Sequence, residues 1–204
     1  MTALNPIMQT ATGERENQDR GAVIAGSRCV LVVADGVGGM SGGAEAAAMV
    51  IDLIREHAEL LANSISCTSL LQRIDQDIAR DPNAGETTCA LAVATDDQVF
   101  GASVGDSGVW IIGENTFTDL TQRQSRKPLV GSGSASAISF AERRVTGTCL
   151  LLATDGLLKY APSERIVAVC RGFVSESDAV RLIELARYPS GALPDDVTVI
   201  LTRL

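Results

Sequence analysis

The chain has 204 residues, of which 46% are apolar and 21% charged, and its net charge is −8. This length can bury one substantial core, so we expect a single domain over residues 1–204. The acidic charge argues against general nucleic-acid binding, which requires a basic surface. No stretch approaches the roughly 20 apolar residues that span a bilayer, and the first residues lack the basic start and apolar core of a secretion signal. We therefore expect a cytoplasmic protein that binds neither nucleic acid nor a membrane.

Short runs rich in β-branched residues, bounded by turn residues, predict the strands. These runs are residues 21–26, 29–34, 87–95, 98–105, 108–113, 149–154 and 197–204. Asp96 and Asp97 predict a hairpin between the third and fourth of these strands. The Gly-Asp-Ser-Gly stretch at 105–108 predicts a second hairpin, between the fourth and the fifth.

Three stretches carry the apolar spacing of amphipathic helices. They run from 43 to about 63, through 70–78, and from 175 to 186. Asp178 is placed to stabilise the first turn of the last helix, and the polar, Gly- and Ser-rich residues 122–138 predict a loop. Because strands pair as hairpins and helices come in two blocks, without regular β-α-β alternation, we expect an α+β fold of antiparallel sheets flanked by helices.

Cysteine and histidine residues show no catalytic or metal-binding pattern. The five cysteines are Cys29, Cys67, Cys89, Cys149 and Cys170. Their odd number, their scatter and their apolar surroundings indicate buried, reduced thiols. The single histidine, His57, lies on the apolar stripe of the first predicted helix, where packing is a more common role than catalysis.

Asp35 ends an apolar run and is followed by five glycines within eight residues. A nucleotide-binding loop does not fit, because Ser41 replaces the last glycine of GxGxxG and the GK[ST] of a P-loop is absent. A bare carboxylate would also repel phosphate. A divalent cation between Asp35 and a phosphate would remove this repulsion, and such a site needs further carboxylates at the ends of other strands.

Further carboxylates do lie beside other predicted strands: Asp19, Asp106, Asp155, Asp195 and Asp196. Asp155 repeats the arrangement of Asp35, an apolar run followed by aspartate and glycine. Carboxylate, carbonyl and water oxygens are the ligands that Mg²⁺ and Mn²⁺ prefer, and a glycine after the ligand lets its carbonyl turn toward an ion. The sequence therefore predicts an acidic site for divalent cations.

The ordered motifs RENQD, ADGVGG, GETT, VGDSGVWII, LLLATDGL and DDVTVILT resemble those of the metal-dependent protein Ser/Thr phosphatases of the PP2C (PPM) type. The resemblance extends over nearly the whole chain and is closest to the compact bacterial form. It implies a four-layer α/β/β/α sandwich of two mainly antiparallel sheets. It also implies hydrolysis of phosphoserine and phosphothreonine by a hydroxide that bridges two Mn²⁺ or Mg²⁺ ions, on a phosphorylated protein such as a Ser/Thr kinase or its targets.

Carried over residue by residue, the resemblance gives the ligands of the two main ions. Asp35 bridges both ions, and the Gly36 carbonyl binds one of them. Asp155 and Asp195 hold the other ion. Asp35 and Asp155 are therefore expected to be catalytic residues.

Four further residues take roles by the same resemblance. Asp19 lies near the ions as an additional ligand, and Asp106 helps to hold a third, weaker ion. Arg15 is the expected catalytic and substrate-binding residue, since a forked guanidinium suits phosphate oxygens. Arg20 is the alternative to Arg15.

Three departures from the family pattern keep other interpretations open. Gln18 replaces a glutamate ligand, Val37 stands where many members have a histidine, and residues 120–148 are shorter than the usual flap. Gln18 and the short flap favour a pseudophosphatase, a binding or regulatory module with a weakened metal site. The scarcity of basic residues also leaves open a phosphatase of small phosphorylated molecules.

Overall fold

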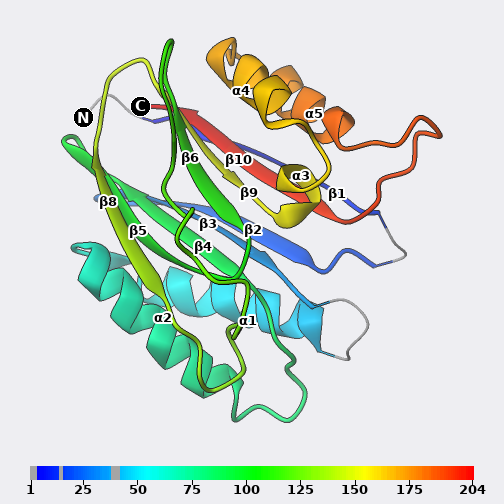
Figure 1. Ribbon diagram of the computed structural model, residues 1–204. Helices are drawn as coiled ribbons and strands as arrows, with labels where there is room; N and C mark the ends of the chain where they lie inside the picture. Colours follow the sequence, from blue (N-terminus) through cyan, green and yellow to red (C-terminus); the bar gives the residue numbers. More distant parts are fainter. Residues whose placement is uncertain (1–3, 14–15, 38–41) are drawn as a thin grey trace.

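The computed structural model describes residues 4–13, 16–37 and 42–204, and these residues form two antiparallel five-stranded sheets that pack face to face (Figure 1). The first sheet contains, in order, β1 (Ile7–Ala11), β10 (Val197–Arg203), β9 (Cys149–Ala153), β6 (Gly108–Ile112) and β7 (Phe117–Asp119). The second contains β2 (Asp19–Ala25), β3 (Cys29–Asp35), β4 (Cys89–Ala94), β5 (Gln98–Val104) and β8 (Ile138–Arg143).

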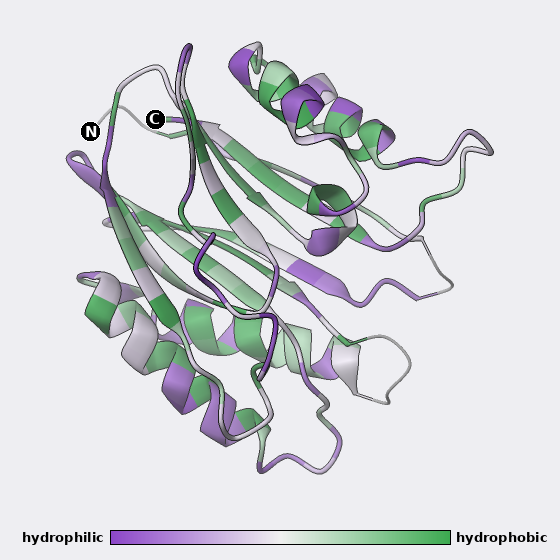
Figure 2. Cartoon of the chain, viewed as in Figure 1, coloured by the Kyte–Doolittle hydropathy of each residue, from purple (hydrophilic) through white to green (hydrophobic). Residues whose placement is uncertain are grey.

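Helices cover the outer face of each sheet (Figure 1). The second sheet is covered by α1 (Gly43–Glu56) and α2 (Ser64–Ile78), and the first by α4 (Ser163–Arg171) and α5 (Glu176–Leu185). Short helical turns, η1 (Ala58–Leu60) and α3 (Asp155–Leu158), complete the described helices. Hydrophobic residues fill the strands and the inner helix faces, whereas hydrophilic residues lie on the outer helix faces and loops (Figure 2). The predicted four-layer α/β/β/α sandwich is confirmed.

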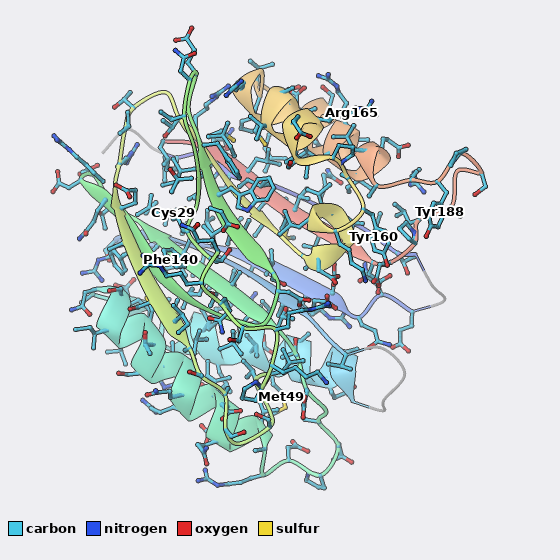
Figure 3. All side chains as sticks on the ribbon, in the orientation of Figure 1. Cys29, Met49, Phe140, Tyr160, Arg165 and Tyr188 are labelled. Atoms are coloured by element: carbon cyan, nitrogen blue, oxygen red, sulfur yellow. The ribbon has the colours of Figure 1, made fainter. Side chains whose placement is uncertain are left out.

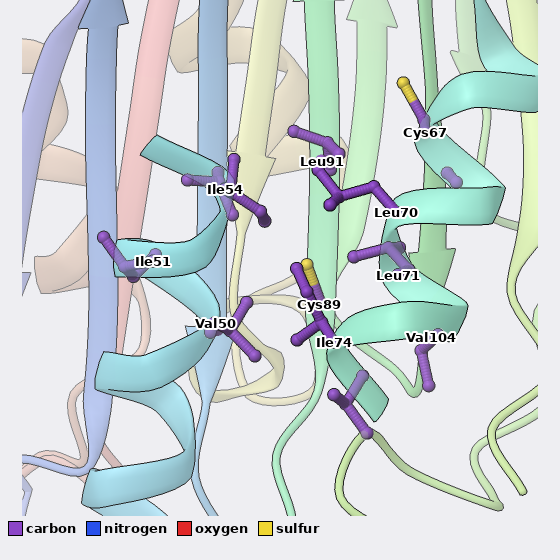
Figure 4. Close-up of a cluster of buried hydrophobic side chains, with 14 of the residues drawn as sticks. Val50, Ile51, Ile54, Cys67, Leu70, Leu71, Ile74, Cys89, Leu91 and Val104 are labelled. Atoms are coloured by element: carbon purple, nitrogen blue, oxygen red, sulfur yellow. The ribbon is translucent and has the colours of Figure 1, made fainter. Parts of the chain in front are cut away.

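Buried side chains of the described residues form three clusters, one between each pair of neighbouring layers. Alternate residues of β3 enter different clusters: Val32 faces the helices, whereas Leu31 and Val33 face the other sheet. Because both faces of β3 are covered, its sequence is an uninterrupted apolar run. Figure 4 shows the helix-side cluster, in which Ile54 of α1 and Leu71 of α2 point toward the sheet.

All seven predicted strands form, and the described residues add β1, β7 and β8. Two of these additions are short or largely exposed, so their hydropathy does not mark them. The first predicted helix ends early, at Glu56, and Asn63 then begins α2 by accepting the Ser66 N–H. Asp178 caps α5 as predicted, through hydrogen bonds from Val174 N–H and Ser175 N–H. The short helices α3 and α4 were not predicted.

The second predicted hairpin, at 105–108, is wrong. The strand β5 pairs with β4 and β8, whereas β6 pairs with β7 and β9 in the other sheet. Gly105 has a φ of +86°, a left-handed conformation that turns the chain sharply. Asp106 and Ser107 therefore lie where the chain crosses from one sheet to the other.

All five cysteines lie within the described ranges and are free, and four of them are buried. Cys29 is half-buried at the start of β3 (Figure 3), at the opposite end of this strand from Asp35. His57 follows α1, and its Nδ1 lies 2.9 Å from the Leu53 carbonyl oxygen, in accordance with the expected packing role. Among the helices of the described residues, none has the length and hydropathy needed to cross a bilayer.

Candidate functional site

A cavity of about 440 Å³ gathers the predicted carboxylates at one end of the sandwich. Its acidic lining residues are Asp35, Asp106, Asp155, Asp195 and Asp196. These residues are far apart in the sequence and come from both sheets, because β3 ends here in one sheet, and β9 ends and β10 begins here in the other. The fold therefore brings together the acidic residues that the strand-end argument singled out.

Asp35 is held through its backbone by two threonines of the GETT motif. Its carbonyl oxygen accepts hydrogen bonds from the Thr87 hydroxyl at 2.9 Å and the Thr88 N–H at 2.8 Å. Its own N–H donates to the Thr88 hydroxyl at 3.0 Å, and that hydroxyl is 2.7 Å from the hydroxyl of Ser107. The two threonines of GETT and the serine of GDS, to which the sequence alone assigns no role, thus fix the position of Asp35.

The glycine after each Asp-Gly aspartate is required by close backbone packing. A Cβ at Gly156 would collide with the Asp196 carbonyl group, and a Cβ at Gly36 would collide with the carbonyl of Gly43. The close approach at Gly156 brings the start of α3, with Asp155, against the segment that precedes β10. Glycine is therefore needed for the approach of these segments, in addition to any freedom it gives its own carbonyl.

The neighbouring residues Asp195 and Asp196 have different surroundings. Asp196 is buried, and its Oδ1 accepts hydrogen bonds from the Thr12 hydroxyl at 2.9 Å and the Gly13 N–H at 2.8 Å. Its Oδ2 accepts one from the Gln18 N–H at 2.7 Å. Asp195 is half-buried in the cavity wall, and its Oδ1 accepts the Asp196 N–H. Both oxygens of Asp196 are therefore engaged by Thr12, Gly13 and Gln18, whereas Asp195 keeps one oxygen in the cavity wall without such a donor among the described residues.

Asp19 lies opposite Asp35 in the β2–β3 pair, beneath the cavity rather than in its lining. Its side chain is buried, and Oδ2 accepts a hydrogen bond from the Thr154 hydroxyl at 2.7 Å. Its Oδ1 is buried and has no hydrogen-bond partner among the described residues. Burial raises the pKa of Asp19 from 3.8 to about 7.

The electrostatics of the site favour a cation. Burial, and then the charge of Asp19, raise the pKa of Asp35 to about 9. Burial and the charge of Asp106 also raise the pKa of Asp155. Carboxyl groups that ionise with difficulty in the absence of a nearby positive charge are suitable ligands for hard divalent ions.

The described acidic side chains are spread around the cavity rather than gathered into one compact group. No three His, Cys, Asp or Glu side chains among the described residues form a compact ligand group. Mg²⁺ usually keeps several waters and takes only one or two carboxylates, so the spread of these aspartates suits such ions. The unpaired Asp19 Oδ1 and the raised pKa values agree with this fit.

The raised pKa values predict how the stability of the metal-free protein depends on pH. The folded protein keeps protons on Asp19 and Asp35 that the unfolded chain releases near its ordinary pKa of 3.8. The contribution of these groups is therefore complete below about pH 4 and is lost as the pH rises through about 7 and then about 9. Urea unfolding in EDTA over this range should show a falling free energy of unfolding. A slope that is the same in Asp35→Asn would contradict this assignment.

Of the two arginines proposed for phosphate binding, only Arg20 lies within the described residues, and it does not line the cavity. Arg15 lies outside the described residues. The guanidinium of Arg20 donates to the carbonyl oxygens of Asn17 and Asp19, each at 2.7 Å. Arg20 is thus engaged with the backbone of its own segment.

The sequence analysis missed three cationic residues that line the cavity: Arg126, Lys127 and Lys159. The Arg126 Nε lies 2.6 Å from Asp106 Oδ2, and the Lys159 Nζ lies 4.0 Å from Asp155 Oδ2. Lys159 follows Asp155 by four residues, a spacing that can indicate a helical ion pair. Nothing in the spacing of Arg126 or Lys127 marks them, because a loop brings them to the cavity.

Known proteins share both the sequence pattern and this fold. Residues 10–186 match the model of the family described as protein phosphatase 2C. The serine/threonine phosphatase stp of Listeria welshimeri is 25% identical over 225 residues, 91% of this chain and 89% of the relative.

Two solved structures show the same architecture. Stp1 from Staphylococcus aureus is 21% identical, with a TM-score of 0.81 over 100% of this chain and 96% of its own. The catalytic domain of PstP, in complex with two manganese ions, is 21% identical, with a TM-score of 0.83 over 98% and 97%. These structures support the four-layer fold, and the family match covers most of the chain. The chain therefore belongs to the protein phosphatase 2C family of metal-dependent serine/threonine phosphatases.

Proposed function

We propose that this chain dephosphorylates phosphoserine and phosphothreonine in proteins with two Mn²⁺ or Mg²⁺ ions held in the acidic cavity. The observation that carries this proposal is the meeting of Asp35 from one sheet with Asp155 and Asp195 from the other. When bound, two such ions supply Lewis acidity, which lowers the pKa of water and offsets charge on phosphate oxygens.

Each ligand has a distinct position in the proposed site. Asp35, at the end of β3, and the Gly36 carbonyl that follows it would supply oxygens to the ions from one wall of the cavity. Asp155 and Asp195 would supply oxygens from the segments that follow β9 and precede β10 of the other sheet. Asp19 acts from beneath, because its unpaired Oδ1 can accept a hydrogen bond from a water bound above it. The hydrogen bonds to the Asp35 backbone keep this geometry fixed during the reaction, which limits reorganisation.

Arg15 remains the proposed substrate-binding residue. It follows Gly13 by two residues, and the Gly13 N–H donates to the cavity-lining Asp196 at 2.8 Å. A guanidinium near this edge would bind two phosphate oxygens at once. Arg15→Ala is expected to raise the KM for a phosphopeptide by about tenfold or more, with little change in the melting temperature. An unchanged KM would show that Arg15 does not bind the substrate phosphate.

The proposal also covers the substrate, the cellular location and the extent of the domain. The family match supports a phosphorylated protein as the substrate, and we extend this to a Ser/Thr kinase or the targets of one. We place the reaction in the cytoplasm, and we assign the activity to one domain that spans residues 1–204.

The test compares hydrolysis of phosphoserine peptides and of p-nitrophenyl phosphate in Mn²⁺, Mg²⁺ and EDTA. Wild type is expected to act on both with either metal, to favour the peptides in kcat/KM, and to lose activity in EDTA. Asp155→Asn should be inactive although folded. Well-folded wild type that is inactive in millimolar Mn²⁺ would overturn the enzyme assignment in favour of a regulatory module, and a preference for small phosphoesters would overturn the protein substrate.

Gln18 provides a separate test of the metal site. It lines the cavity, and its amide nitrogen, oriented to satisfy its hydrogen bonds, donates to the Gly36 and Val37 carbonyl oxygens at 3.2 Å each. Gln18→Glu is expected to tighten Mn²⁺ binding by about tenfold, because a carboxylate is a better ligand than a neutral amide. Isothermal titration calorimetry measures this affinity. Weaker binding in Gln18→Glu would show that the amide contributes only through the backbone of Gly36.

A further inference from the structure

An arginine spans two carboxylates at the rim of the acidic cavity. Arg126 lies in the loop between β7 and β8, with its Nε 2.6 Å from Asp106 Oδ2 and its Nη2 3.8 Å from Asp155 Oδ2. Both carboxylates are largely covered, with side chains 24% and 14% exposed. The guanidinium thus places a permanent positive charge between two acidic groups of the cavity.

The loop that carries Arg126 is anchored after this residue by a buried carboxylate. Asp75 of α2 is 2% exposed, and its Oδ1 accepts hydrogen bonds from the Gly131 N–H at 2.9 Å and the Gly133 N–H at 3.0 Å. Its Oδ2 accepts one from the Ala135 N–H at 3.0 Å. Hydrogen bonds to a buried carboxylate are among the stronger ones in proteins, so this part of the loop is fixed to the helix.

The same loop is anchored before Arg126 by Gln124. Its Oε1 accepts hydrogen bonds from the Ser103 hydroxyl and the Ile138 N–H, each at 3.2 Å. Its Nε2 donates to the Ser136 carbonyl oxygen at 3.1 Å. Arg126 therefore follows one anchor by two residues and precedes the other by five, and the short loop presents its side chain to the cavity from a fixed base.

We propose that the Arg126 guanidinium occupies the cation position between Asp106 and Asp155, in place of the third ion that the family resemblance implies for Asp106. The protein then binds two divalent ions and supplies the third positive charge from its own chain. A divalent ion and a guanidinium repel each other, so the position between Asp106 and Asp155 cannot hold both. This inference rests on the proposed two-ion site and adds that no third divalent ion binds beside it.

Lys127 provides the matched control. It is adjacent in sequence and also lines the cavity, but Arg126 makes the ion pairs with Asp106 and Asp155. Loss of Lys127 changes the net charge of the cavity wall by the same amount as loss of Arg126. A difference in bound ions between the two variants therefore depends on the position of the lost charge and not on the net charge of the cavity wall.

The experiment measures Mn²⁺ stoichiometry by equilibrium dialysis and calorimetry for wild type, Arg126→Ala, Lys127→Ala and the double variant Arg126→Ala/Asp106→Asn. We expect two ions per chain in wild type and in Lys127→Ala, one additional weaker ion in Arg126→Ala, and loss of that ion in the double variant. Because the Arg126 side chain is 71% exposed, these variants should fold, which the melting temperature checks.

The outcomes separate this inference from the function on which it rests. Two ions in both wild type and Arg126→Ala would overturn the role of Arg126 but would leave the two-ion site unaffected. A third ion in wild type would also overturn it, because Arg126 would then not take the place of that ion. Fewer than two ions in wild type would overturn the two-ion site, and the assignment of Arg126 with it.

Discussion

Asp35→Asn is expected to abolish metal-dependent phosphatase activity while making the metal-free protein more stable. The activity should fall by about 10²–10³-fold or more, the effect of losing one group that organises charge in a transition state. The free energy of unfolding in EDTA at about pH 8 should rise by about 2 kcal/mol or more, because folding at this pH requires Asp35 to take up a proton that asparagine does not need. The reason is that burial and neighbouring aspartates disfavour the Asp35 carboxylate unless a cation is present.

Asp52→Asn is the control for this change. Asp52 lies on the exposed face of α1, where it forms a surface ion pair with Arg55, and its side chain is 74% exposed. Removing this charge should alter stability by less than about 0.5 kcal/mol and leave activity unchanged. Phosphopeptide turnover and urea unfolding with and without Mn²⁺ measure both quantities. Destabilisation of metal-free Asp35→Asn would contradict a role in cation binding and would indicate a structural carboxylate.

Gly156→Ala is expected to destabilise the protein by about 3 kcal/mol and to remove most activity, although it adds only one methyl group. The new Cβ would collide with the backbone carbonyl of Asp196, and a backbone contact cannot be relieved by a side-chain rotation. The segments that carry Asp155 and Asp195 would have to separate. Mn²⁺ affinity should therefore fall together with the melting temperature.

Gly172→Ala tests whether the effect is specific to the close approach. Gly172 follows α4 with a φ of −83°, and a Cβ there would meet its nearest neighbours, the carbonyl oxygens of Ala168 and Val169, at an ordinary 3.8 Å. This alanine should be neutral or stabilise the protein by up to about 1 kcal/mol, through the unfolded state. Equal destabilisation in both variants, or a stable and active Gly156→Ala, would show that Asp196 can move without disturbing the site.

Strands whose two faces are both covered could be predicted from the sequence most directly. The strand β3 contains Leu31 and Val32 on opposite buried faces, and it is evident as an apolar run. The strand β8 lies at a sheet edge and is mostly exposed, so its sequence has no such run. The predicted hairpin at 105–108 does not form. Local turn chemistry does not determine which sheet the next strand joins, because long-range packing determines it.

The candidate site divides in a similar way. Asp35 and Asp155 could be found because each ends a buried strand in the same Asp-Gly arrangement, and the fold brings both to one cavity. The choice of Asp195 over Asp196 came from the family resemblance, because the hydrogen bonds from Thr12 and Gly13 to Asp196 leave no mark on the local sequence. The position of Arg126 depends on the anchoring of its loop, which no local pattern encodes.

The origin of the acidic residues in two different sheets has a mechanical consequence. Ions held by Asp35 on one side and by Asp155 and Asp195 on the other would act as a cross-link across the sheet–sheet interface. Binding to the folded state alone stabilises it by about 2.7 kcal/mol when the free ion is at one hundred times its dissociation constant. Amide hydrogen exchange at the ends of β3 and β9 should then slow in parallel on metal addition. The catalytic ions would thus also stabilise the packing of the two sheets against each other.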